Sequence, residues 1–205
     1  MLTLTDFYPQ VALECPGVPV PILDDAIRRA MRRFCERTHA YRKTYTVTTT
    51  ATVSGYSPLG VDVDLLGVKE FYDAGGSDIK VAPLASLNKL TAASRKPEYY
   101  AVSDGPDEPI TLYPTPDATY ALTLVAAVKP SRTATSFDDV LMTWEEAIVA
   151  YAKYLLQGQV DRPWTDHDAA ARNLRRFGTL VTEAFWQQAT DNGATEVFVR
   201  QRPAA

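Results

Sequence analysis

The sequence predicts a mixed α+β protein: a small helical bundle with an inserted antiparallel β-sheet. Apolar residues recur at steps of three or four in residues 22–43 and again in 144–191, which is the helical period. Between them, in residues 44–129, the period changes to two, which is typical of strands. The simplest arrangement packs the N-terminal helix on two C-terminal helices, with the sheet inserted between them.

Four parts follow from this arrangement within the 205 residues, a length that suits one domain with a sizeable insertion. They are an N-terminal arm and first helix (1–43), an inserted β region (44–130), the C-terminal helices (131–193) and an extended tail (194–205).

The first helix is expected over residues 22–43, after an arm that four prolines make irregular. Pro21 suits a first helical position, and Asp24 and Asp25 suit the first turn, where the helix dipole favours anions. One face is apolar. The opposite face carries a row of arginines, Arg28, Arg29, Arg32, Arg33 and Arg37.

The β region is expected to form one small antiparallel sheet of five to seven short strands. The expected strands cover residues 44–53, 61–68, 70–73, 79–81, 99–102, 110–113 and 120–129. Gly75 and Gly76 suit a tight hairpin turn, since glycine accepts positive φ. A helical turn is expected within residues 83–92.

Helical signals return after a linker at residues 130–139. Thr143 and Glu146 have the spacing of a capping box at the start of a helix over 144–158. Thr165 and Asp168 offer a second cap, for a helix that reaches about residue 191 and stops at Asn192-Gly193. The expected inner side of this last helix holds Ala169, Leu174, Phe177, Leu180, Val181, Ala184, Phe185 and Gln188.

Composition excludes several classes of protein. The net charge of −4 argues against a protein that coats nucleic acid. No apolar run approaches the roughly 18 residues of a membrane-spanning helix. Two cysteines make no disulfide framework, so a reducing compartment is expected.

Catalytic and metal sites are not expected, and neither is a cofactor. Cys35 and His39 share a helix face, but with Cys15 and His167 they match no zinc signature, and a triad would need a nucleophile beside a histidine. The acidic residues around His167 suit a helix N-terminus. Asp104, Asp107 and Glu108 read as a polar hairpin turn.

Two features favour binding to a partner. The arginine row is open to three interpretations: a solvated face, a contact with an acidic partner or neighbouring subunit, or a contact with the DNA backbone. The tail follows a clear helix stop and carries Val197, Phe198, Val199, Arg200 and Arg202. It is either a frayed end or a strand that pairs with another chain through backbone hydrogen bonds.

Several segments resemble the head-to-tail adaptor (head-completion or connector) proteins of tailed bacteriophages. LDDAIRRA and FCERT in residues 23–38 resemble the first helix of that family. YPTPD at 113–117, with Leu122 to Ser131, is similar to the strand and exit loop of its larger members. WEEAI at 144–148 and Pro163-Trp164 resemble its C-terminal helical hairpin.

The resemblance implies a structural virion protein of the neck, not an enzyme, that assembles in the host cytoplasm without contacting a membrane. Such proteins form a ring, commonly of twelve, beneath the portal. The ring extends the channel through which DNA passes without sequence-specific binding, and it docks a downstream neck or tail protein. In the family a C-terminal segment commonly reaches into the portal. Arg28, Arg29, Arg32 and Arg33 are then candidates for contacts with neighbouring subunits or the portal.

Three other functions stay open at this point. One is another neck protein, such as a tail-completion or tail-tube subunit. A second is a small hydrolase that uses Asp104 or His167. A third is a regulatory DNA-binding module that uses the first helix.

Overall fold

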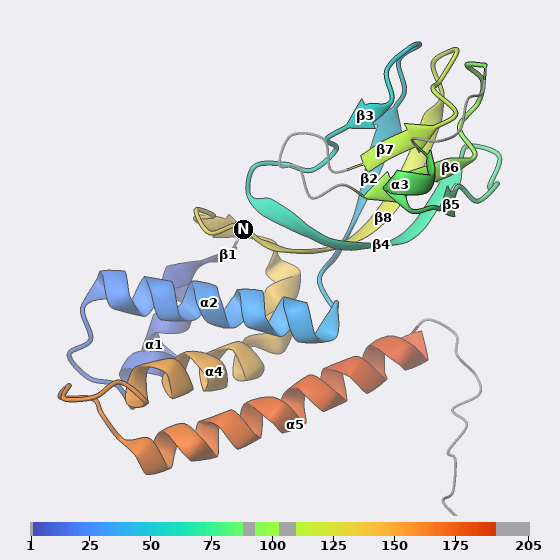
Figure 1. Ribbon diagram of the computed structural model, residues 1–205. Coiled ribbons are helices and arrows are strands. Elements are labelled where there is room, and N and C mark those ends of the chain that lie inside the picture. Colours follow the sequence, from blue (N-terminus) through green and yellow to red (C-terminus); the bar gives the residue numbers. More distant parts are fainter. Residues whose placement is uncertain (1, 88–92, 103–109, 192–205) are drawn as a thin grey trace, which may run out of the picture. The chain divides into compact units, whose positions relative to one another are not determined.

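The computed structural model describes residues 2–87, 93–102 and 110–191 (Figure 1). The chain divides into two compact units, residues 1–40 with 138–205 and residues 41–137. The first is mainly helical and the second mainly β, so the predicted mixed α+β class is confirmed.

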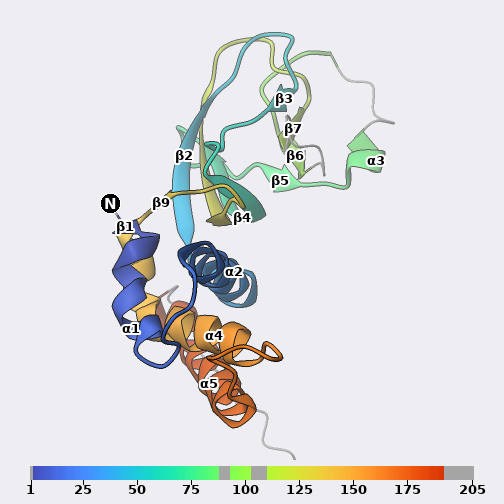
Figure 2. The ribbon, with the colours of Figure 1, turned by 90° about the vertical axis from the view of Figure 1, so that its left-hand side faces the viewer.

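The helical unit contains short elements at its start and three longer helices. Its elements are β1 (Leu2–Thr3), the 3-10 helix η1 (Leu4–Phe7), α1 (Tyr8–Ala12), α2 (Val20–Thr38), the 3-10 helix η2 (Asp139–Trp144), α4 (Glu145–Gln157) and α5 (His167–Asp191). Figures 1 and 2 show α4 between α2 and α5.

Aromatic contacts tie this unit together. The ring centroids of Phe34 on α2 and Trp144 at the start of α4 lie 5.5 Å apart, and those of Tyr151 on α4 and Phe177 on α5 lie 4.6 Å apart. The predicted irregular arm instead forms η1 and α1, and its Phe7 is fully buried. Apolar side chains of the arm therefore fold it onto the helices despite its prolines.

The predicted first helix is wrong at its C-terminal end, since α2 stops at Thr38 and not at residue 43. His39 adopts the left-handed conformation, with φ of 53°, and its N–H donates to Cys35 O at 2.8 Å. Thr38 Oγ1 donates to Phe34 O and accepts from Ala40 N, which satisfies the last turn. Because α2 begins at Val20, Asp24 lies beyond its first turn, where it accepts a hydrogen bond from the Tyr8 hydroxyl.

Both predicted caps of the later helices are wrong. η2 precedes α4 and is capped by Asp138, whose Oδ1 accepts from Val140 N at 3.2 Å. At α5 the cap is Asp166, whose Oδ1 accepts from Ala169 N at 2.9 Å. Thr165 Oγ1 donates to Gln159 O and so belongs to the preceding turn.

The β unit contains two sheets where the sequence predicts one. Its elements are β2 (Arg42–Thr48), β3 (Gly55–Tyr56), β4 (Val63–Asp73), β5 (Lys80–Val81), α3 (Leu84–Leu87), β6 (Tyr99–Val102), β7 (Ile110–Tyr113), β8 (Ala121–Pro130) and β9 (Ser136–Phe137). One sheet has the order β2-β8-β4 and the other β3-β7-β6-β5. All pairs within these two sheets are antiparallel except β5 with β6, which a connection through α3 makes parallel.

The core of the three-stranded sheet lies on its central strand, β8. Leu124 is fully buried and stands in register with Tyr45 on β2 and Phe71 on β4. The two strands expected at 61–68 and 70–73 form one strand, β4, because register shifts at its bulges let it continue along β8.

The hairpin after β4 turns where the two glycines predict it. Gly76 has φ of 79°, and Asp73 Oδ1 accepts from Gly75 N at 2.8 Å and from Ser77 N at 2.9 Å. Lys96 pairs with the same carboxylate, which is almost fully buried. The hydrogen bond from Lys96 is the largest cause that lowers the pKa of Asp73, and the bonds from Ser77 and Gly75 lower it further.

We expect Asp73→Asn to lower the thermal midpoint of the protein at pH 7. A carboxylate whose pKa falls on folding stabilises the fold above its ordinary pKa of 3.8 and loses that contribution as pH falls through the folded value. The difference in midpoint between wild type and variant, followed by circular dichroism, should therefore shrink below pH 3.8. Asp78→Asn, at the other end of the same hairpin, is the control. A difference in thermal midpoint between wild type and Asp73→Asn that stays constant below pH 3.8 would contradict this role of the Asp73 charge.

Candidate functional site

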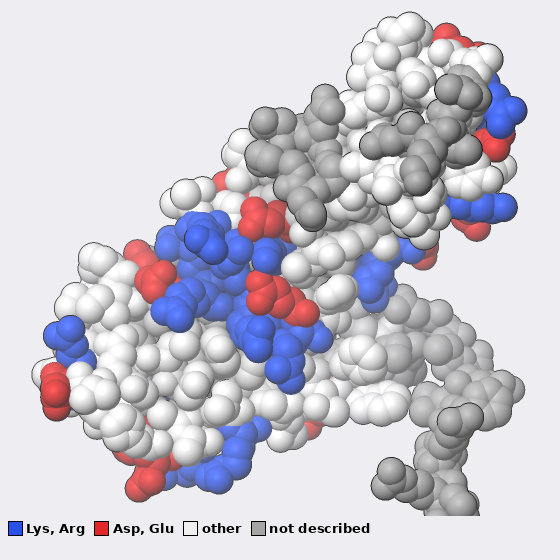
Figure 3. All heavy atoms as spheres, viewed as in Figure 1, with Lys and Arg blue, Asp and Glu red and all other residues white. Residues whose placement is uncertain are grey.

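The arginine row lies along the outer side of α2 (Figure 3). Arg29, Arg33 and Arg37 are exposed, while Arg28 and Arg32 are half-buried. The four predicted contact residues therefore lie in adjacent turns on one surface of α2: Arg28, Arg29, Arg32 and Arg33.

Carboxylates on the same helix neutralise part of this charge. Arg29 lies 3.5 Å from Asp25, and Arg33 lies 3.7 Å from Glu36. Exposed pairs of this kind are weak and salt-sensitive, so a partner carboxylate can replace them at little cost. The row is therefore suited to reversible contact with an acidic protein surface.

The other predicted contact residues belong to the tail. Val197, Phe198, Val199, Arg200 and Arg202 lie outside the described residues, as does the expected helix stop at Asn192-Gly193. The helix that leads to the tail, α5, is described as far as Asp191.

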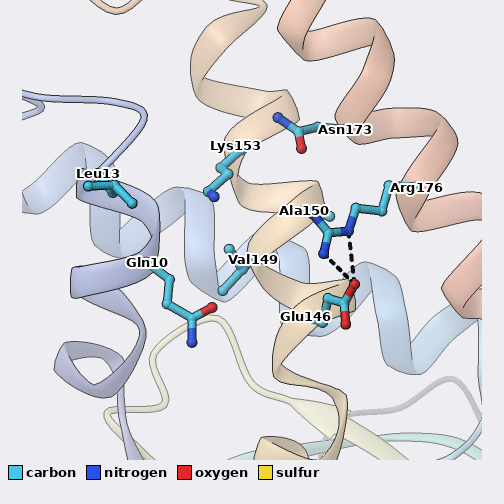
Figure 4. Close-up of a pocket in the computed structure, with 8 residues that line it drawn as sticks. All are labelled: Gln10, Leu13, Glu146, Val149, Ala150, Lys153, Asn173 and Arg176. Carbon is cyan, nitrogen blue, oxygen red and sulfur yellow. Dashed lines mark hydrogen bonds and ion pairs between the residues drawn. The ribbon is translucent and has the colours of Figure 1, made fainter.

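A groove of about 230 Å³ opens between α1, α4 and α5 (Figure 4). Leu13, Val149 and Ala150 supply its apolar part. Two ion pairs border it: Lys153 Nζ lies 2.7 Å from Glu14 Oε1, and Arg176 lies 2.5 Å from Glu146 Oε1. The groove combines an apolar strip with paired charges, a combination that suits a protein segment.

The Lys153 pair is the most buried charge of the helical unit among the described residues. Lys153 is 8% exposed, and its hydrogen bond to Glu14 is the largest cause that lowers the pKa of that carboxyl. Asn173 Nδ2 donates to Gln157 Oε1 at 2.9 Å beside the pair. Sequence reasoning missed this cluster, although a lysine within the apolar run of residues 147–156 is a signal for it.

The outer face of α5 carries exposed apolar side chains. Leu174 is 42% exposed and Phe185 54%, so the prediction that both belong to the inner side is wrong. The buried side of α5 is formed by Ala169, Ala170, Phe177, Val181 and Ala184, and all of these except Ala170 were predicted there. Trp186 is 50% exposed and makes an edge contact with Phe185, at a centroid distance of 6.1 Å.

The residues considered for catalysis or metal binding lie apart or take structural roles. His39 ends α2 and His167 begins α5. Cys15 and Cys35 are buried thiols that form no disulfide, and burial raises the pKa of Cys15 to about 11. Within residues 2–87, 93–102 and 110–191, no three histidine, cysteine or acidic side chains gather into a metal-binding group. Asp104, Asp107 and Glu108 lie outside those ranges.

None of the helices in the described part of the chain is both long and apolar enough to cross a bilayer. The described residues form charged and apolar surfaces on packed helices. Surfaces of this kind are typical of structural proteins that work through contact with other proteins.

Comparison with models of protein families identifies the family. Residues 2–204, nearly the whole chain, match the family described as SU10 adaptor protein, and the protein belongs to this family of phage adaptors. The resemblance to head-to-tail adaptors is thereby confirmed, and with it a structural role in a bacteriophage virion. No curated protein matches the chain.

Proposed function

We propose that the protein is a head-to-tail adaptor that forms a ring beneath the portal, extends the DNA channel and docks a downstream neck or tail protein. The family match over residues 2–204 is the observation that carries this proposal. In this proposal the ring has twelve subunits and lies in the virion neck. DNA passes through it without sequence-specific contact.

The three long helices suit the body of such a ring. α4 packs against both α2 and α5, and the β unit of residues 41–137 lies between α2 and α4 in the sequence. This packing exposes the arginine row of α2 for contact with a neighbouring subunit or the portal. Acidic side chains elsewhere on the chain provide the complementary charge, since the net charge is −4.

The tail suits contact with the portal. Residues 192–205 span up to about 50 Å if fully extended, a reach far beyond the width of one helix. Val197, Phe198 and Val199 are apolar and β-branched or aromatic, so they favour an added strand, and Arg200 and Arg202 add positive charge.

We expect the full-length protein, mixed with the portal protein encoded beside it, to give a second ring stacked on the portal in negative-stain images. Deletion of residues 194–205 should abolish this binding while the circular dichroism spectrum and thermal midpoint stay unchanged. Arg29→Glu with Arg33→Glu should weaken ring formation, because the exposed row changes sign.

The matched control for the charge change is Arg162→Glu with Arg172→Glu, two exposed arginines outside α2. It should stack on the portal like wild type. Unchanged binding by the deletion variant would remove the tail from the portal contact. A full-length protein that binds the tail tube and ignores the portal would overturn the portal assignment in favour of a tail-side neck protein.

A further inference from the structure

The outer face of α5 has an apolar knob near its C-terminal end. Phe185 and Trp186, each about half exposed, stand in edge contact with each other. Exposed aromatic pairs of this size are typical of protein interfaces, where they supply a large contact area with few rotatable bonds.

A depression lies near the other end of the same helix. It has a volume of about 380 Å³, and the residues that line it come from the end of α4 and the turn after it and from the start of α5: Tyr154, Leu155, Gly158, Gln159, His167, Ala170, Ala171 and Leu174. Small alanine side chains and the exposed Leu174 make this concave surface mainly apolar, with Gln159 and His167 as its polar members. It is therefore suited to receive an aromatic side chain.

Gly178 lies midway between the knob and the depression. It is exposed, and a Cβ built on it meets no atom within 4 Å. Glycine destabilises a helix interior relative to alanine, and packing among the described residues gives no reason for it here. A glycine without a side chain does allow the backbone of a second helix to approach closely.

The three features share one stripe. Ala171, Gly178 and Phe185 are seven residues apart, so the stripe drifts only about 20° per step. Ala171 and Phe185 are separated by about 21 Å along the axis, at 1.5 Å per residue. The knob and the depression lie on one face at equal distances from Gly178. If a second copy is turned by 180° about an axis through this glycine, the knob of each copy meets the depression of the other.

Charge favours the same antiparallel orientation. The N-terminal half of α5 carries the exposed Arg172, Arg175 and Arg176 against one exposed acid, Asp168, while the C-terminal half carries the exposed Glu183. Antiparallel pairing brings the arginines of one copy beside the half that carries Glu183 of the other. Parallel pairing would place the arginines of the two copies together and would align the helix dipoles unfavourably.

We propose that the protein, before it assembles, forms a two-fold symmetric dimer in which α5 pairs antiparallel with α5 of a second copy. The two helices cross at Gly178, and Phe185 of each copy enters the depression beside Ala171 of the other. This inference goes beyond the adaptor function, because it concerns the free protein and a surface separate from the arginine row and the tail.

Disulfide cross-linking tests the crossing point. Gly178→Cys should give a disulfide-linked dimer on mild oxidation, because only a two-fold contact places a residue against its own copy at the 4.4–6.8 Å between Cα atoms that a disulfide needs. Thr179→Cys, exposed on the same helix but about 100° away from the stripe, is the control and should cross-link at least about tenfold less. Cys15 and Cys35 are buried, so wild type should stay uncross-linked.

Sedimentation equilibrium tests the knob. Phe185→Asp should raise the dimer dissociation constant at least about tenfold, since it places a charge in the apolar depression of the partner. Val20→Asp is the matched control, because Val20 and Phe185 are both 54% exposed, and it should dimerise like wild type.

The outcomes separate this proposal from the adaptor function. The tail deletion and the variant Arg29→Glu with Arg33→Glu should form the same dimer as wild type, whatever they do to portal binding. A wild-type protein that stays monomeric at high concentration would overturn the proposal. Equal cross-linking of the two cysteine variants would also overturn it, as would a free ring in which Gly178→Cys forms no disulfide.

Discussion

Phe34→Ala is expected to destabilise the helical unit by about 3–5 kcal/mol. Phe34 is fully buried, and its ring centroid lies 5.5 Å from that of Trp144. It therefore joins α2 to the start of α4, two elements that are distant in sequence. Removing the ring loses the transfer free energy of its atoms and leaves a cavity that the flanking helices can fill only in part.

Urea denaturation followed by tryptophan fluorescence is the measurement for Phe34→Ala. All three tryptophans, Trp144, Trp164 and Trp186, belong to the helical unit, so their emission reports on that unit. Leu13→Ala is the control, since Leu13 is 82% exposed and its truncation should change stability by less than about 0.5 kcal/mol. Equal midpoints for the two variants would show that the contact of Phe34 with Trp144 does not hold α2 in place.

Leu124→Ala is expected to destabilise the β unit by about 2–5 kcal/mol. Leu124 is fully buried on β8, the central strand of its sheet, and has Tyr45 and Phe71 as its cross-strand neighbours. Truncation therefore removes contacts toward both outer strands at once, and the sheet cannot close the cavity by moving one strand alone.

Far-ultraviolet circular dichroism during urea denaturation measures this effect, because the tryptophans lie outside the β unit. Val81→Ala is the control, since Val81 is 70% exposed on an edge strand and should change stability by less than about 0.5 kcal/mol. A loss below about 1 kcal/mol for Leu124→Ala would mean that β8 is not the centre of this core.

The sequence predicts long periodic elements well and their ends poorly. Strands β6 and β7 have the predicted bounds, and α4 differs from its prediction by one residue at each end. The end of α2 was missed because it depends on the backbone of His39, which adopts φ of 53°, a conformation that few residues other than glycine adopt. Periodicity contains no information on such a conformation.

The alternation of apolar and polar residues also did not predict which strands pair. Alternation predicts that a strand exists, but the separation into two sheets and the parallel pairing of β5 with β6 depend on contacts between residues distant in sequence. The arginine row was predictable because it follows from helical spacing alone. The exposure of Leu174 and Phe185 was not, because both lie at the edge of the buried side that carries Phe177, and helical spacing does not show how far neighbouring helices cover that side.

The helical unit is built from two separated stretches of chain, residues 1–40 and 138–205, while the β unit is continuous. During synthesis on the ribosome, α2 is complete long before α4 exists to cover Phe34. At about 5–20 residues per second, the intervening residues take roughly 5–20 s to appear. The apolar side of α2 is thus an exposed intermediate surface over that interval, and the β unit can fold first. Although α2 is made early, it is therefore among the last elements to be packed, because its partner α4 is made late.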